Sequence, residues 1–220
     1  NKSTPRMPKQ EPMPCQLYLI SPPQFVPDVF SEDLKRAIAG GVDVVGAFQL
    51  RLKDVSDDDV LRAAEVLMPI CAEHEIPFLV NDRPDLAEAS GAEGVHVGQS
   101  DASYDEARAI LGDNKTVGVT CHDSRHLAMT AGEKGADYVA FGAFYPTTTK
   151  EAKHHPEPDI LEWCSSMTIL PCVAIGGINQ ENCGPLIDAG ADFLAVISSV
   201  WGYADGPEAA VAAFAEKLQA

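Results

Sequence analysis

The chain has 220 residues, of which 45% are hydrophobic, and its 33 acidic and 16 basic residues give a formal net charge of −17. This length suits one domain or two small ones, and the hydrophobic fraction excludes a mainly disordered chain. The acidic balance argues against nucleic acid and membrane surfaces as partners, because both attract basic proteins. No apolar run approaches the roughly 18 residues of a membrane span, and no charged-then-apolar signal segment opens the chain. We therefore expect a cytoplasmic protein.

The cysteines stand at irregular spacings, and no two of them form a CxxC pair. A domain of this size can bury an adequate core without disulfides. We therefore expect free thiols in a reducing compartment. The six residues concerned are Cys15, Cys71, Cys121, Cys164, Cys172 and Cys183.

The first 14 residues read NKSTPRMPKQEPMP, where proline and charge dominate and nothing repeats at the period of a helix or a strand. We predict that residues 1–14 are a flexible, proline-rich tail and that residues 15–220 form the folded domain.

After this tail, short apolar runs alternate with amphipathic stretches. The first half of the chain predicts strands at 17–20, 42–52, 78–80 and 94–97, with helices at 31–40 (capped by Ser31), at 56–73 (capped by Ser56) and from Pro84 onward. The second half predicts a helix at 104–111 that Gly112 stops, strands at 116–119, 138–141, 169–175 and 193–197, and helices at 124–134, 159–165, 180–189 and 207–218.

Each of the eight predicted strands is followed by a helix, which is typical of a parallel sheet. Eight such units in about 200 residues predict an α/β protein with a single-domain (β/α)₈ TIM barrel. A doubly wound open sheet is the structural alternative.

Polar residues follow the second predicted strand, in the segment Gln49-Leu50-Arg51-Leu52-Lys53. Because strand side chains alternate between faces, Gln49, Arg51 and Lys53 share one face. The two leucines are then expected to pack against helices, and the polar three to point into the barrel mouth, where function resides in this fold. Buried cations need anionic partners. The alternative is an exposed edge strand with solvated charges.

Two carboxylates follow the third and fourth predicted strands, Asp82 and Asp101. Carboxylates on adjacent loops can hold one Mg²⁺, with waters and substrate oxygens completing its shell. Beside the cations of the second strand, they make a diphosphate–Mg²⁺ site plausible. Alternatively, both aspartates are helix caps.

A second anion site is predicted after strands seven and eight, where Gly176-Gly177 and Ser198 stand. Glycines let backbone N–H groups approach a phosphate closely, and this barrel commonly binds phosphate here. The loop after strand six adds the hydroxyls of 147–149 and Lys150. Two anion sites would suit two phosphorylated substrates, one of them a diphosphate.

Six motifs follow one another in an order that resembles the thiamine phosphate synthase (thiamine-phosphate pyrophosphorylase) family. They are QLRLK at 49–53, NDRPDLA at 81–87, GVHVGQSD at 94–101, VGVTCH at 117–122, PTTTK at 146–150 and VAIGGI at 173–178. The resemblance covers about residues 16–215 and implies a (β/α)₈ barrel that couples hydroxymethylpyrimidine diphosphate to a thiazole phosphate and releases diphosphate.

By this resemblance, diphosphate departs in a Mg²⁺-dependent, dissociative step, and the thiazole nitrogen traps the resulting pyrimidine methyl cation. The catalytic residues implied are Arg51, Lys53, Thr120 and Lys150. The pyrimidine diphosphate would be bound by Gln49, Leu50, Arg51, Leu52, Lys53, Asn81, Thr120 and Lys150. The thiazole phosphate would be bound by Thr147, Thr148, Thr149, Gly177, Ile197 and Ser198, and Mg²⁺ by Asp82 and Asp101.

The chain departs from the family pattern at several places. Thr120 stands where serine is common, Leu52 where an acidic residue is common, and the stretch EAKHHPEPDIL after Lys150 lacks the usual sequence. An alternative function is a thiazole tautomerase-type homologue with His122 as acid and base and no coupling activity. A non-enzymatic alternative is a thiamine-phosphate-binding regulator.

Other features of the sequence stay open. His122 and His126, four residues apart, could share a helix face and bind zinc, although no third ligand is evident and solvent-facing histidines are favoured. The sequence leaves open the oligomeric state, a homo-oligomer included, and the roles of His154 and His155. It also leaves open whether the thiazole substrate carries a carboxylate.

Overall fold

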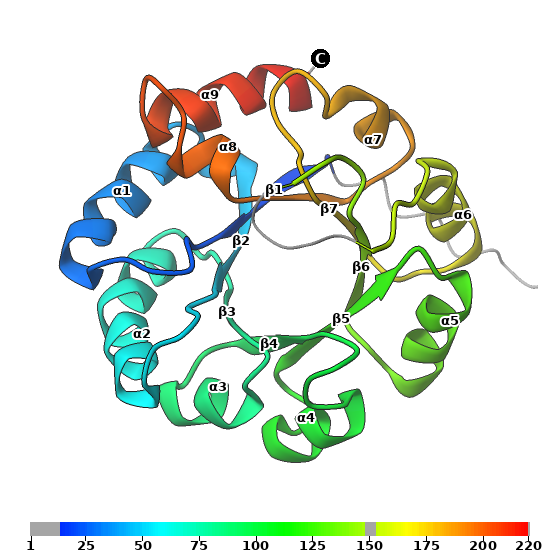
Figure 1. The fold of residues 1–220 in the computed structure, drawn as a ribbon, viewed down its shortest axis with the longest axis horizontal. Helices are drawn as coiled ribbons and strands as arrows, with labels where there is room; N and C mark the ends of the chain where they lie inside the picture. The colour runs from blue at the N-terminus through cyan, green and yellow to red at the C-terminus, as the bar shows by residue number, and fades with distance from the viewer. Residues whose placement is uncertain (1–13, 148–152, 220) are drawn as a thin grey trace, which may run out of the picture.

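The computed structural model describes residues 14–147 and 153–219, and its strands form a closed parallel barrel in sequence order (Figure 1). Each strand pairs with the next, and β8 closes the barrel by pairing with β1. This confirms the TIM barrel and rules out the open sheet. All but the last residue of the expected tail, together with Thr148, Thr149 and Lys150, lies outside the described residues.

The helices form an outer ring around the barrel, as Figure 1 shows. The strands are β1 (Gln16–Ile20), β2 (Val45–Leu50), β3 (Phe78–Asn81), β4 (Gly94–Val97), β5 (Thr116–His122), β6 (Tyr138–Gly142), β7 (Cys172–Ile175) and β8 (Phe193–Val196). The ring comprises α1 (Pro27–Ala39), α2 (Asp57–Ala72), α3 (Pro84–Ser90), α4 (Tyr104–Leu111), α5 (Arg125–Lys134), α6 (Asp159–Met167), α7 (Gly184–Asp188) and α9 (Pro207–Leu218), with the shorter η1 (Val42–Val44) and α8 (Ser198–Trp201) in the connections.

Strand alternation divides the core into two layers. One layer lies between the barrel and its helices, and it contains large side chains such as Phe48 and Phe78, whose ring centres are 5.3 Å apart. The other fills the barrel interior with Tyr18, Ile20, Ala47, Leu79, Tyr138, Ala140, Val173 and Ala195. The two tyrosines bring hydroxyl groups into this mainly apolar layer.

Local sequence signals fix several helix ends as predicted. Ser56 caps α2 through a capping box with Asp59, and Pro84 begins α3. Gly91 ends α3 in the left-handed conformation (φ 78°), which favours glycine. Strand β4 and helices α4 and α9 have the predicted bounds.

Two predicted boundaries in the first half of the chain are wrong. Helix α1 begins at Pro27 and not at a Ser31 cap, because proline suits the first helical position; the Ser31 hydroxyl instead donates to the carbonyl of Asp28. Strand β2 covers only the middle of the predicted 42–52 strand. The first three residues of the predicted strand form η1 instead. After β2, the N–H of Arg51 donates to the hydroxyl of Ser21 and not to a neighbouring strand.

Further corrections concern the second half. Strand β7 begins at Cys172 rather than at residue 169, since Pro171 cannot donate to the ladder and Ile169 is fully exposed. Helix α7 is shorter than predicted, because Asn179 and Asn182 form a turn before it by binding each other's backbone N–H groups. Strand β5 extends three residues further than predicted, and α8 was not predicted at all.

The six cysteines carry free thiols, as predicted, and five of them are buried. Among the described helices, none combines the length and the apolar character that crossing a membrane requires.

Candidate active site

The residues predicted from the second strand divide between the two faces of β2. Gln49 is 3% exposed, and its amide nitrogen donates to the Tyr18 hydroxyl in the barrel interior at 2.9 Å. Leu50 is buried in the outer core, and Leu52 packs against the same core. The predicted alternation is confirmed for Gln49 and Leu50, whereas residues 51–53 lie beyond the end of β2. Because β2 pairs with both β1 and β3, the edge-strand alternative is wrong.

Arg51 and Lys53 follow β2 at the mouth of the barrel. The guanidinium of Arg51 makes no hydrogen bond or ion pair to any residue that the structure describes. Burial lowers its pKa, while the nearby charge of Asp82 acts in the opposite direction. Lys53 Nζ forms an ion pair with Asp82 Oδ2 at 2.8 Å. A partly desolvated cation beside an ion pair is suited to bind an anion.

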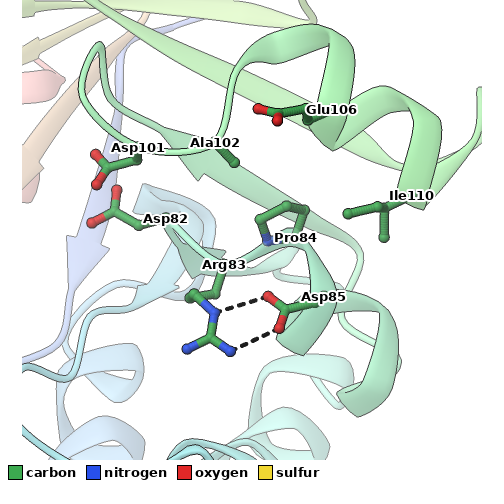
Figure 2. A pocket seen from close by; sticks show the side chains of 8 residues that line it. All are labelled: Asp82, Arg83, Pro84, Asp85, Asp101, Ala102, Glu106 and Ile110. Carbon is green, nitrogen blue, oxygen red and sulfur yellow. Dashed lines mark hydrogen bonds and ion pairs between the residues drawn. The ribbon is translucent and has the colours of Figure 1, made fainter.

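The loops after β3 and β4 bring Asp82 and Asp101 together, with their carboxylates turned toward each other (Figure 2). The backbone of Asp82 is left-handed (φ 63°), and its N–H donates to the carbonyl of His96 at 2.8 Å. Asn81 Nδ2 donates to Asp82 Oδ2 at 2.7 Å. Asp101 lies against Gly98, where an added Cβ would approach Asp101 Oδ2 to 2.6 Å.

Neither aspartate caps a helix, so that alternative is wrong. The residue at the N-cap of α3 is Arg83, and the N-cap of α4 is Ser103, which forms a capping box with Glu106. The positions of Asp82 and Asp101 therefore have no explanation in helix capping.

A cavity of about 580 Å³ opens beside the two aspartates, and Figure 2 shows its lining. Arg83 in its wall is bound to Asp57 at 2.8 Å and to Asp85 at 2.7 Å, which raises the pKa of the guanidinium and lowers the pKa of both carboxyls. The cavity is lined by Asp82, Arg83, Pro84, Asp85, Asp101, Ala102, Glu106 and Ile110.

The donor set at this cavity fits Mg²⁺ better than a soft metal. No group of three or more His, Cys, Asp or Glu side chains within 14–147 and 153–219 could hold a metal ion. Mg²⁺ commonly takes only one or two carboxylates from a protein and completes its shell with waters and phosphate oxygens. Two facing carboxylates near the half-buried guanidinium of Arg51 therefore suit it.

The residues predicted to form a phosphate cradle follow β7 and β8, two strands that pair with each other. Gly177 has φ 63°, and an added Cβ would overlap the carbonyl oxygen of Pro146 and lie 2.9 Å from Tyr145. Ile197 lies at the N-cap of α8, and Ser198 is its first residue. The first N–H groups of a helix have no acceptor within the helix. The buried Ser199 hydroxyl also has no hydrogen-bond partner among the described residues.

Thr120 lies on β5 and contacts a residue that sequence reasoning did not select. Its Oγ1 is 2.7 Å from Nε2 of His96, whose ring stacks on Tyr138 and whose Nδ1 is 2.8 Å from the Tyr138 hydroxyl. The signal in the sequence was a polar side chain at an interior-facing position of the strand GVHV.

His122 and Cys121 end β5 and lie outside this network. His122 has a left-handed backbone (φ 54°), and its ring stacks on that of His154, with centres 4.5 Å apart. Because His122 belongs to β5 and His126 to α5, the two do not share a helix face. Burial raises the pKa of Cys121 to about 12, which disfavours a role as nucleophile.

Comparisons with known proteins agree on one family. The family described as thiamine monophosphate synthase matches residues 17–200. The thiamine-phosphate synthase of Rhodospirillum centenum is 57% identical over 200 residues, covering 91% of this chain and 96% of its own. That of Erythrobacter litoralis is 53% identical over 211 residues, covering 94% and 97%.

Solved structures share the barrel fold of this chain. Thiamine phosphate pyrophosphorylase from Pyrococcus furiosus superposes with a TM-score of 0.81 at 30% identity, covering 93% of this chain and 95% of its own. (S)-3-O-geranylgeranylglyceryl phosphate synthase from Thermoplasma acidophilum has a TM-score of 0.69 at 13% identity, covering 93% of each chain, and shares the fold alone.

Proposed function

The chain belongs to the thiamine monophosphate synthase family, and from that premise we propose how its own residues carry out the reaction. Its function is the synthesis of thiamine phosphate, which makes it a transferase of thiamine biosynthesis. The substrates in this proposal are hydroxymethylpyrimidine diphosphate and a thiazole phosphate.

Arg51 and Lys53 bind the diphosphate of the first substrate. The observation that carries this proposal is the half-buried guanidinium of Arg51, which has no partner in the described residues and lies near the Asp82–Lys53 ion pair. A planar guanidinium can bind phosphate oxygens in pairs. Gln49 on β2, Asn81 on β3 and Thr120 on β5 would orient the pyrimidine. Lys150, which lies outside the described residues, would add a third cation.

Asp82 and Asp101 would hold Mg²⁺. When bound, the ion would neutralise negative charge that grows on the departing diphosphate. The protein's own part is to supply two carboxylates of fixed position. Asp82 is held by Asn81 and Lys53, and Gly98 leaves room for Asp101.

The thiazole phosphate binds at the ends of β7 and β8. Gly177, Ile197 and Ser198 bind its phosphate, and Thr147 and the threonines at 148 and 149 contact the rest of the molecule. Support comes from the close approach of backbone at Gly177 and from the start of α8, where N–H groups are available.

These residues position the two substrates and stabilise the charge of the departing diphosphate. Diphosphate departs first, with Arg51 and Lys53 stabilising its charge, and the thiazole nitrogen then attacks the pyrimidine methyl cation. No general base is needed to form this bond. Each side chain lost from the diphosphate site is expected to reduce the rate by about 10² to 10³.

The tautomerase alternative is less favoured. It would need His122 as acid and base, but that ring is stacked on His154, whose Nδ1 lies 3.0 Å from Asp123. It would also leave the Arg51, Lys53 and Asp82 arrangement without a use.

We place the reaction in the cytoplasm, with the two small molecules as the partners. The six free thiols support a reducing compartment. An oligomer is compatible with this proposal and is tested by sedimentation of the purified protein.

The test measures diphosphate and thiamine phosphate with both substrates, with and without Mg²⁺. We expect equal amounts of the two products, only with Mg²⁺, and a loss of about 10² to 10³ in Asp82→Asn. The matched control is Asp85→Asn, which changes an aspartate of the same cavity that Arg83 already binds. Mg²⁺-independent turnover, or equal loss in both variants, would refute the assigned metal ligands.

A further inference from the structure

A continuous chain of hydrogen bonds crosses the barrel interior and ends at Thr120. It joins side chains of five different strands through oxygen or nitrogen atoms 2.9, 2.7, 2.8 and 2.7 Å apart. In order, these are Gln49 on β2, Tyr18 on β1, Tyr138 on β6, His96 on β4 and Thr120 on β5. Both of its ends are residues assigned above to the pyrimidine diphosphate.

The hydrogen-bonded tyrosines lie among apolar side chains, and their hydroxyl groups are not needed to fill space. Tyr18 and Tyr138 are 3% and 7% exposed, and they pack with the aliphatic residues of the interior layer. Gly118 on β5 leaves room for the Tyr138 ring, because an added Cβ would overlap that ring. Apolar replacements of the same shape can be nearly neutral for stability, so hydroxyl groups here call for another explanation.

The side-chain amide of Gln49, at one end of the row of hydrogen bonds, determines their direction. The amide nitrogen of Gln49 only donates, so the Tyr18 hydroxyl accepts from it. Tyr18 then has one proton of its own, and the Tyr138 hydroxyl is its one remaining partner among the described residues. If Tyr138 donated to Tyr18 instead, the buried Tyr18 proton would have no acceptor there, which is unfavourable.

The hydrogen bonds from Tyr138 to His96 and from His96 to Thr120 run in the same direction. Burial raises the pKa of Tyr18 to about 12 and that of Tyr138 well above its ordinary value, so both hydroxyls keep their protons. Tyr138 accepts from Tyr18 and donates to Nδ1 of His96. His96 therefore carries its proton on Nε2 and donates it to Oγ1 of Thr120. The hydroxyl proton of Thr120 then points away from His96 and can be donated to another acceptor.

We propose that Tyr18, Tyr138 and His96 are positioning residues that fix the Thr120 hydroxyl as a hydrogen-bond donor toward the pyrimidine diphosphate. This inference rests on the proposed function, which assigns Thr120 to that substrate. The partner atom is an acceptor, either on the pyrimidine ring or on the diphosphate. With the opposite direction, Thr120 would present lone pairs to that acceptor and repel it.

The first measurement uses the wild-type protein alone. Nitrogen-15 NMR of labelled histidines, with the His96 signals assigned by His96→Gln, reports which ring nitrogen carries the proton. We expect the neutral ring with its proton on Nε2. A proton on Nδ1 would overturn the proposal without any reference to activity.

The second measurement is kinetic and uses Tyr138→Phe, which interrupts the chain at its centre. We expect the KM for the pyrimidine diphosphate to rise about ten- to a hundredfold, corresponding to one hydrogen bond, while the KM for the thiazole phosphate stays unchanged. Tyr18→Phe should have a smaller effect, because Tyr138 can still donate to His96. The control Tyr104→Phe removes a hydroxyl that binds Arg108 on α4 and should leave both values unchanged.

Binding of two fragments identifies the acceptor. Weaker binding of inorganic diphosphate with Mg²⁺ to Tyr138→Phe locates the acceptor on the diphosphate, and weaker binding of the pyrimidine alcohol locates it on the ring. Unchanged binding of both fragments, or equal rises in both KM values, would overturn the proposal. Wild-type protein that fails to couple the two substrates would instead refute the proposed function, because the tautomer measurement does not depend on it.

Discussion

Gly177 allows a quantitative test of the phosphate cradle through the substitution Gly177→Ala. The residue has φ 63°, and a Cβ there would overlap the carbonyl oxygen of Pro146 and lie 2.9 Å from the backbone carbon and Cβ of Tyr145. A left-handed backbone costs a residue with a side chain about 1–2 kcal/mol. Overpacking against atoms that cannot rotate away adds about 1–3 kcal/mol.

Gly91→Ala is the matched control for this substitution. Gly91 is also left-handed, with φ 78°, but an added Cβ meets no atom within 4 Å. It should therefore lose only the conformational contribution of about 1–2 kcal/mol. For a chain of this length, each kcal/mol lowers Tm by about 2–4 °C. Gly177→Ala is then expected to melt several degrees below Gly91→Ala.

The two variants also differ in their expected kinetics. The overlap at Gly177 displaces the segment that contains Pro146 and Thr147, so the KM for the thiazole phosphate should rise about tenfold or more, which is 1.4 kcal/mol or more of binding. The KM for the pyrimidine diphosphate should stay near the wild-type value in both variants. Thermal melting and initial rates with each substrate varied measure these effects. If Gly177→Ala matched Gly91→Ala in both Tm and KM, the assignment of Gly177 to the cradle would be refuted.

Two further changes test the cation site and the barrel interior. Arg51→Lys should lower kcat/KM for the pyrimidine diphosphate by about 10- to 100-fold without lowering Tm, because lysine cannot bind phosphate oxygens in pairs; Arg62→Lys, an exposed position on α2, serves as the control, and equal losses in the two would contradict the assignment. The raised pKa of Tyr18, about 12 in the folded protein against about 10 when unfolded, predicts stability that is fully present below pH 10 and lost as the pH rises toward 12. Urea unfolding at pH 9 and 11 should show a smaller alkaline loss in Tyr18→Phe than in wild type, and an equal loss would contradict it.

The sequence predicts those parts of the fold that depend on local chemistry. The capping box at Ser56 and the proline at the start of α3 act within one turn of helix, and both are where the sequence places them. The predicted boundaries are wrong where a proline sets the start of an element, or where a residue distant in the sequence sets its end. Pro27 and Pro171 were both visible in the sequence, and each one moves the start of an element. The end of β2 instead depends on Ser21, thirty residues away.

In the candidate site, too, local features are predictable from the sequence and contacts between distant residues are not. Alternation along one strand is enough to separate Gln49 from Leu50, and the structure confirms it. The hydrogen bond between Tyr18 and Tyr138 spans 120 residues, and it exists only because the barrel closes. No spacing rule relates two residues so far apart, so the interior chain that ends at Thr120 could not be predicted from the sequence.

The charges at the mouth of the barrel explain how a chain with a net charge of −17 can bind anionic substrates. Salt screens charges beyond about 8–10 Å, so the nearest groups decide the local field. Among the described residues proposed to bind the diphosphate and its ion, Arg51 and Lys53 balance Asp82 and Asp101, and the ion pair between Lys53 and Asp82 makes part of that balance direct. A site with two positive and two negative groups has little net attraction for a diphosphate by itself. A divalent cation on the two aspartates would leave the site net positive, which gives a physical reason for this pair of carboxylates to lie beside a half-buried arginine.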